Sequence, residues 1–353
     1  MEFKKITVGP LTSINNLVYH LSKQFLEIRT DYLLGKRPVF KLDFSDIKSH
    51  SISLPALASL LSVGKKLSEF IGYPIPVITI WEPHTLAFLH QTNFIQIAKK
   101  LNIFSFEDDI DGWSWFTADR PLNPNTKLLY FGDVKPISHF DPSEIGTQKA
   151  LHKQKLISNL KLRCSAVFNG FNNKLENTLY NTLLELIVNS LMHGQEFAFV
   201  ALQRSSKGIT IAVCDSGIGF KRSLQQTFSY PQLNELKDEE AILIGSLIQK
   251  EIHGLRLAIS EVLRYRENDF ELKNEGWVTI SSYGAEIRWQ KRAWREALNH
   301  FEQLDLNHQK PSISDIFDPI YHGQIDEEAL ENGYCRTYNH FLVGTRISFE
   351  IKF

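Results

Sequence analysis

The chain has 353 residues, 43% of them hydrophobic and 22% charged, with a formal net charge of -1. This length suits two domains, and the near-neutral charge does not indicate nucleic acid or an anionic membrane as a partner. The start, MEFKKITVGP, lacks an apolar signal core, and no run approaches the roughly 20 apolar residues of a membrane helix. Three cysteines without a CxxC pair argue against a disulfide framework or zinc site. We therefore expect a cytoplasmic globular protein.

The first 107 residues alternate predicted strands with predicted helices. Residues 39–44 alternate apolar and polar side chains as a strand does, and residues 76–81 form a second apolar strand. Residues 54–71 and 84–101 carry apolar side chains at helical spacing. This order predicts an α/β domain.

Residues 108–144 differ in character, because glycine and proline recur there among aromatic residues. Such a composition predicts a connector between domains or an exposed hairpin. The second domain is predicted to span residues 145–353 and to be α/β as well. It contains a helix that begins near residue 146 and a long helix at 173–193. Strands are predicted at 209–214, 277–282, 285–289 and 344–353. Residues 290–339 form a polar, partly helical insertion.

The strongest chemical signal is LLELIVNSLMHG at residues 183–194. Glu185, Asn189 and His193 stand four residues apart, so a helix places them on one face. The amide oxygen of Asn189 could bind a hard cation such as Mg²⁺, and the Glu185 carboxylate could act as a general base. The alternative is an ordinary polar helix face with a capping histidine beside Gly194.

A second signal is ITIAVCDSGIGF at residues 209–220. An apolar strand runs into Asp215, after which Gly217 and Gly219 permit a tight turn with positive φ. The glycines would let a flat ligand approach the backbone, and Asp215 could accept a hydrogen bond from an exocyclic amine such as that of adenine. Alone, DxGxG is often only a turn, but here it follows the ExxxNxxxH helix closely.

Together the two blocks resemble the N-box and G1 box of the GHKL ATPases, the superfamily of gyrase, the heat-shock chaperone, the mismatch-repair ATPase and histidine kinases. The anti-sigma serine-kinase type is most similar, because its N-box also ends in His-Gly. The resemblance implies a Bergerat ATP-binding fold, a two-layer α/β sandwich with a mixed sheet, that binds ATP and Mg²⁺. It also implies roles: Glu185 catalytic, Asn189 on the metal, Asp215 on adenine, and His193 at the helix end or on phosphate.

Residues 238–259 resemble the lid and G2 box of the same family. Family members carry more glycines there, whereas this chain has Gly254, followed by Leu255 and then by Arg256 where a second glycine is common. Amides at such a turn would cradle phosphates, and Arg256 could add a positive charge. The alternative is a plain helix start. The pair Gly344-Thr345 matches the late GT pair that lies near adenine in the family.

The N-terminal segment resembles the STAS fold of anti-sigma antagonists, in which a strand ends in Asp and a phosphorylatable Ser begins the next helix. Ser51 and Ser53 lie near that position, although the usual aspartate-serine dipeptide is missing. Either serine could instead be an N-cap. A STAS-like domain joined to a GHKL domain would be a regulatory or docking module.

Three functions follow from these patterns. The first is a nucleotide-driven switch that closes a lid, dimerises or grips a partner protein, and is reset by ATP hydrolysis. The second is an anti-sigma-like protein serine kinase. The third is a degenerate nucleotide-binding scaffold, which the single glycine of the G2-like loop favours and the intact Glu185 opposes.

Overall fold

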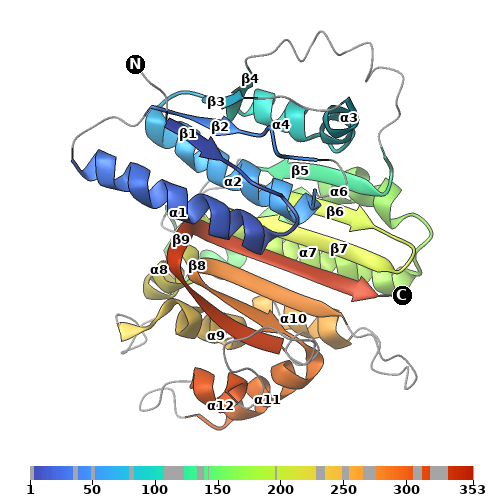
Figure 1. Cartoon of the computed structure of the whole chain (residues 1–353). Helices are drawn as coiled ribbons and strands as arrows, with labels where there is room; N and C mark the ends of the chain where they lie inside the picture. Colours follow the sequence, from blue (N-terminus) through green and yellow to red (C-terminus); the bar gives the residue numbers. More distant parts are fainter. Residues whose placement is uncertain are drawn as a thin grey trace.

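The computed structural model describes residues 4–34, 39–48, 52–78, 83–106, 123–132, 139–141, 143–194, 197–227, 235–248, 254–264, 276–304, 312–318 and 333–352. It is a mixed α/β structure with one parallel and one antiparallel sheet (Figure 1). The first part of the chain forms β1 (Lys4–Thr7), α1 (Ile14–Leu33), β2 (Phe40–Asp43), α2 (Leu54–Ile71), β3 (Ile75–Ile78), α3 (Pro83–Gln91), α4 (Phe94–Lys100) and β4 (Phe104–Phe106).

The second part begins with β5 (Thr126–Phe131), α6 (Ile145–Phe168), α7 (Asn173–Gly194), β6 (Ala198–Arg204), β7 (Gly208–Cys214) and α8 (Gly219–Thr227). It continues with α9 (Asp238–Leu247), α10 (Leu255–Arg264), β8 (Trp277–Trp289), α11 (Lys291–Glu302), α12 (Ile313–Phe317) and β9 (Gly333–Lys352).

The parallel sheet has the strand order β1-β2-β3-β4, so each strand lies beside the one before it in the chain. When each parallel strand is added on the same side of the one before it, and every crossover is right-handed, the connecting helices all cover the same face of the sheet. The predicted helix at 54–71 is confirmed as α2, and Gly72 ends it with φ 84°. The predicted helix at 84–101 is instead two helices, because Asn93 adopts φ 74° between α3 and α4.

The antiparallel sheet has the order β5-β6-β7-β9-β8. The family resemblance implies a mixed sheet, whereas every pairing among the described strands of this sheet is antiparallel. β5 lies within the segment predicted as a connector, and β9 starts inside the predicted insertion. The two strands predicted at 277–282 and 285–289 are one strand, β8, with an irregularity beside Tyr283.

Both faces of the antiparallel sheet are buried. In β6, Val200 and Leu202 belong to one hydrophobic core, whereas Phe199 and Ala201 belong to another. The first core is shared with α6, α7 and α10, and the second with the N-terminal helices and the parallel sheet. Strand segments buried on both faces read as continuous apolar runs, which accounts for residues 198–202 of β6 and 211–214 of β7.

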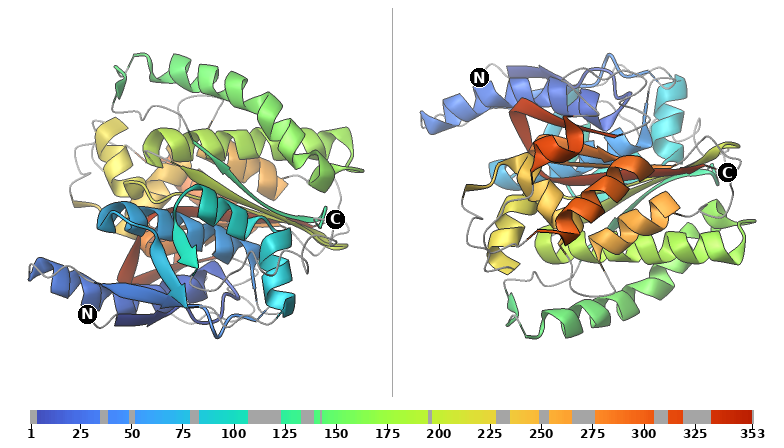
Figure 2. Two further views of the ribbon diagram at one scale, coloured as in Figure 1. Left: turned by 90° about the horizontal axis from the view of Figure 1, so that it is seen from above. Right: turned by 90° about the horizontal axis from the view of Figure 1, so that it is seen from below.

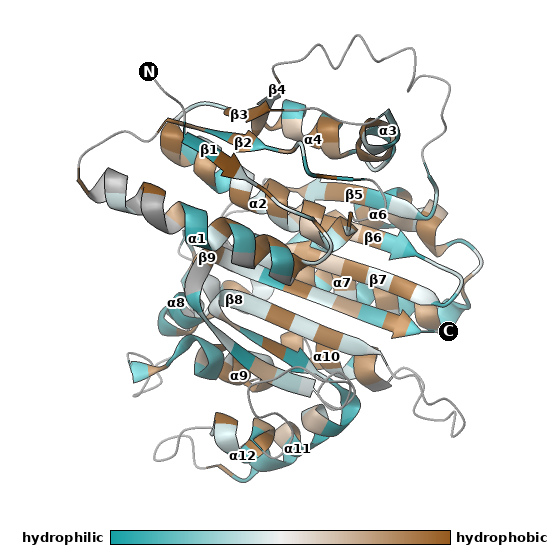
Figure 3. Ribbon diagram, in the orientation of Figure 1, coloured by the Kyte–Doolittle hydropathy of each residue, from teal (hydrophilic) through white to brown (hydrophobic). Residues whose placement is uncertain are grey.

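The chain therefore forms four layers. The parallel sheet is followed by α1, α2 and α4, then by the antiparallel sheet, and then by α6, α7 and α10 (Figures 1 and 2). The central α2 is mostly hydrophobic, whereas the outlying α8 is mostly hydrophilic (Figure 3). Within the described ranges no helix is both long and apolar enough to cross a membrane.

At the start of α2, Ser53 occupies the N-cap position, but its side chain accepts no capping hydrogen bond. Its backbone amide donates to Leu11 O over 2.7 Å, which fixes the entry of the helix. Ser51, the other candidate for a cap or phosphorylation site, lies outside the described residues.

Candidate functional site

Helix α7 positions the first group of candidate residues. The predicted helix is confirmed, and the spacing of four residues aligns Glu185, Asn189 and His193 along one face. On the other side, Ile187 and Leu191 are buried in the core beneath the antiparallel sheet. The apolar side thereby fixes the direction in which the polar side chains point.

Glu185 is 5% exposed and forms ion pairs with two lysines of α6. Lys149 contacts Oε1 and Lys153 contacts Oε2, while Asn189 Nδ2 lies 3.4 Å from Oε1. Burial alone would raise the pKa of Glu185, but the two lysines outweigh it and hold that pKa below its ordinary value. Glu185 is therefore an ionised carboxylate whose charge is already balanced.

The two lysines were not among the residues predicted for the site. They stand four residues apart on α6, so their spacing alone could have placed them on one helix face. No local signal, however, relates that face to α7, because the contact depends on how the two helices pack. The pairing is a tertiary feature.

His193 connects α7 to α8. Its Nδ1 lies 2.8 Å from Ser223 Oγ, within hydrogen-bonding distance. Burial, reinforced by the positive charge of Lys149, lowers the pKa of His193 to about 4, although Glu185 opposes this. The imidazole is therefore neutral at pH 7 and holds the first turns of α8 against the end of α7.

Asp215 follows β7 and is 4% exposed. Its Oδ1 accepts hydrogen bonds from the amides of Gly217, at 2.9 Å, and Thr345, at 3.1 Å. Burial raises the pKa of Asp215 to about 6, against the opposing effects of these amides, Arg346 and the Ser190 hydroxyl. Two backbone amides thus fix the direction of a carboxylate that is costly to ionise.

The glycines of this region are required by close packing within the chain. Gly219 has φ +71°, and a Cβ there would lie 2.3 Å from the ring of Tyr283. Gly344 has φ +99°, and a Cβ there would lie 2.0 Å from Asp215 O. Gly217 does not adopt a positive φ, so the expectation of positive φ at both turn glycines is wrong for this one. The contribution of Gly217 is the amide that binds Asp215.

The residues predicted as a phosphate loop lie at the start of α10, which packs against α7. Gly254 has φ 145°, and its carbonyl accepts the first helical hydrogen bond, from Ala258. Leu255 is buried in the core, and the guanidinium of Arg256 pairs with Glu302 of α11 at 2.6 Å. Arg256 is therefore engaged with a carboxylate in this conformation.

A divalent cation would find few protein ligands here. In the described part of the chain no three His, Cys, Asp or Glu side chains converge as a metal site does. Asn189 donates through its amide nitrogen to Glu185, which leaves its amide oxygen for a ligand. A Mg²⁺ ion at this place would take one oxygen from Asn189 and the rest from phosphate and water, as Mg²⁺ commonly does.

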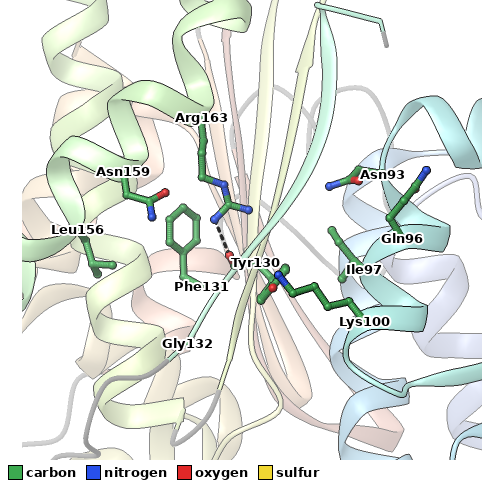
Figure 4. Close-up of a pocket in the computed structure, with 10 residues that line it drawn as sticks. All are labelled: Asn93, Gln96, Ile97, Lys100, Tyr130, Phe131, Gly132, Leu156, Asn159 and Arg163. Atoms are coloured by element: carbon green, nitrogen blue, oxygen red, sulfur yellow. Dashed lines mark hydrogen bonds between the residues drawn. The ribbon is translucent and has the colours of Figure 1, made fainter. Parts of the chain in front are cut away.

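The fold thus assembles three predicted groups, from α7, from the β7–α8 turn and from β9, with Ser190 next to Asn189 reaching Asp215. None of these residues lines the cavity shown in Figure 4, which lies beside β5. Comparisons with protein-family models, with curated proteins and with solved structures found no match for this chain.

Proposed function

We propose that this protein binds ATP with Mg²⁺ at the site formed by α7, the β7–α8 turn and β9, and acts as a nucleotide-driven switch for a partner protein. The observation that carries the proposal is the geometry of Asp215. Its Oδ1 is saturated by two backbone amides, so the carboxylate has one fixed orientation at the end of a buried strand. A fixed acceptor of this kind suits an exocyclic amine, as the resemblance to GHKL ATPases implies.

The environment of Glu185 supports a switch that responds to phosphate. Lys149 and Lys153 are both partly buried and both engaged with one carboxylate. A phosphate chain beside Asn189 would compete with Glu185 for these cations. Release of either lysine would raise the basicity of Glu185 and loosen the contact between α6 and α7.

When bound, the nucleotide would supply the phosphoanhydride bond, and the chain would supply position and proton transfer. Asn189 would hold the cation, and a Glu185 freed from its lysines would accept a proton from the attacking water or hydroxyl. Neutral His193 would keep α8 attached to α7 through Ser223 while this occurs.

A second function is favoured by one observation. A carboxylate neutralised by two lysines is a weak base, and this is the arrangement expected of a module that binds nucleotide without hydrolysing it. Such a scaffold shares the Asp215 pocket with the switch and differs from it only at Glu185.

Calorimetry of Mg²⁺–ATP binding to the wild type, Asp215→Asn and Asp315→Asn tests the pocket. Asp315 is an exposed carboxylate of α12 and serves as the control. We expect wild-type affinity in the control and a loss of at least about tenfold in Asp215→Asn. Absence of binding by the wild type would overturn the proposal.

Phosphate release then separates switch from scaffold. If the protein is an ATPase, Glu185→Gln should lower release roughly 100-fold or more while ATP still binds. Transfer of phosphate to a protein serine instead of water would identify the kinase. Binding with neither reaction would leave the scaffold.

A further inference from the structure

β5 is an edge strand of the antiparallel sheet, and the described residues pair only part of its outer edge. Along that edge the Leu128 amide donates to Thr92 O over 2.9 Å. Two residues further on, Tyr130 O accepts a hydrogen bond from Arg163 Nη1 over 2.8 Å. Leu128 O also accepts a hydrogen bond on this edge, from Asn93 Nδ2 over 3.5 Å. Because outward groups alternate along a strand, the amide of Tyr130 points away from β6 as well, and it has no partner among the described residues.

A cavity of about 550 Å³ lies next to this open stretch, between α4, β5 and α6 (Figure 4). Two cations enter it from opposite sides: Lys100 from α4 and Arg163 from α6. Lys100 Nζ lies 5.4 Å from the centroid of the Tyr130 ring, and Arg163 Cζ lies 5.7 Å from it. Among the described residues that line the cavity none is acidic, so the charge of this lining is positive.

Amide side chains also line the cavity: Asn93 from the junction of α3 and α4, Gln96 from α4 and Asn159 from α6. The buried Gln96 Oε1 has no hydrogen-bond partner in the described part of the chain. Side-chain amides can both donate to and accept from a peptide backbone. Among the described residues, the groove therefore offers an extended peptide one open hydrogen-bonding position on β5, the Tyr130 amide, with side-chain amides beside it and positive charge.

We propose that this groove binds an extended, acidic segment of a partner protein, which adds to β5 as a sixth strand. Edge strands recruit peptides in this way through main-chain hydrogen bonds, with pockets for alternate side chains. Edge strands of natural proteins are usually protected against unwanted pairing. Arg163 protects β5, because its guanidinium donates a hydrogen bond to Tyr130 O.

Binding would exchange one hydrogen bond for another. A peptide amide would replace Arg163 on Tyr130 O, and the freed guanidinium would bind a carboxylate of the same peptide. The exchange makes acidic segments the preferred occupants, because a neutral peptide would leave the displaced Arg163 without a partner. A basic peptide would be repelled by both Arg163 and Lys100.

The experiment uses the full-length protein and the labelled peptide acetyl-TVEVEVT-amide, with binding followed by fluorescence anisotropy. We expect this peptide to bind at least about tenfold more tightly than acetyl-TVKVKVT-amide. Lys100→Glu and Arg163→Glu should each abolish the preference, whereas Lys155→Glu, a change of an exposed lysine of α6 outside the cavity, should preserve it. Circular dichroism confirms that each variant is folded.

Two further arms separate strand addition from simple anion binding. N-methylation of one of the two sets of alternate residues of the acidic peptide should abolish binding, because only that set supplies the amides that would pair with β5. N-acetylglutamate amide should fail to compete. Equal binding of the acidic and basic peptides, binding that survives N-methylation of both sets of alternate residues tested one at a time, or full competition by N-acetylglutamate amide would each overturn the proposal.

Discussion

Arg346 of β9 donates a hydrogen bond from Nε to Ser59 Oγ of α2 across 2.6 Å, and both residues are buried. The guanidinium also binds the carbonyls of Leu342 and Val343. The backbone of Thr345, next to Arg346, exchanges hydrogen bonds with the backbone of Asp215. The Thr345 amide also donates to the Asp215 carboxylate. One short stretch of β9 thus connects the N-terminal helices to the candidate site.

Ser59→Ala should lower the free energy of unfolding by about 1–3 kcal/mol, because it leaves one donor of a buried guanidinium unpaired. The control is Ser105→Ala, at an exposed position of β4. Urea denaturation of the two variants measures the difference. An equal effect in both would show that the Arg346–Ser59 contact contributes nothing to stability.

Gly344→Ala should destabilise the protein by about 3 kcal/mol or more, because the added Cβ would meet Asp215 O at 2.0 Å in a left-handed backbone. Gly146→Ala is the matched control. It lies in α6 with nothing within 4 Å of its Cβ, and alanine there should stabilise by about 0.5–1 kcal/mol. Thermal unfolding distinguishes the two signs.

Asp215→Asn should stabilise the unliganded protein at pH 7 while it weakens ATP binding. The folded protein holds the proton of Asp215 up to about pH 6, whereas the unfolded chain releases it near 3.8. The free energy of unfolding therefore falls by about 3 kcal/mol as pH rises from about 3.8 to about 6. Asparagine does not ionise, so the variant lacks this loss. Denaturation at pH 4 and pH 7 checks it: the variant should gain only at pH 7.

His193→Gln should have the opposite pH signature. The folded protein keeps His193 neutral down to about pH 4, whereas the unfolded chain binds a proton near 6.5. The wild type therefore loses stability as pH falls from 6.5 to 4, and the glutamine variant lacks this loss. The same denaturation series measures it. A variant that tracks the wild type at every pH would show that His193 titrates normally.

Removal of both lysines should cost more than the sum of the single removals. Either Lys149→Ala or Lys153→Ala leaves Glu185 one of its two lysines, whereas the double variant leaves a buried carboxylate with neither and only the Asn189 amide as a described partner. We expect about 1 kcal/mol for each single variant and about 3–5 kcal/mol for the double. Adding Glu185→Gln to the double variant should recover most of the loss, as urea denaturation would show. Strict additivity would contradict the arrangement.

The sequence predicted the parts of the fold that depend on local periodicity. Helices α2 and α7 and strand β7 are confirmed, because their apolar patterns are long and their ends carry clear signals. β5 was not predicted, because it lies in a segment where recurring glycine and proline indicated a connector. The break between α3 and α4 was also missed, since Asn93 is not an obvious helix breaker.

For the candidate site, the sequence supplied candidate residues but not the contacts they make in the fold. Asp215 and Thr345 are brought together, as the family pattern implies. The ion pairs of Glu185 and the engagement of Arg256 with Glu302 depend on helix packing between distant segments. The turn glycines suggest a close approach of a ligand to the backbone. In the structure, Gly219 instead allows the close approach of the Tyr283 ring, and Gly344 that of the Asp215 carbonyl.

The burial of the antiparallel sheet on both faces has a consequence for how the chain can be divided. Phe199, Ala201, Ala212 and Cys214 are covered by the N-terminal helices. A fragment that begins at α6 would present this apolar surface to water and would also lack β5. The two halves are thus complementary pieces of one folding unit. A gene split between them would need both products in the same cell to yield a stable protein.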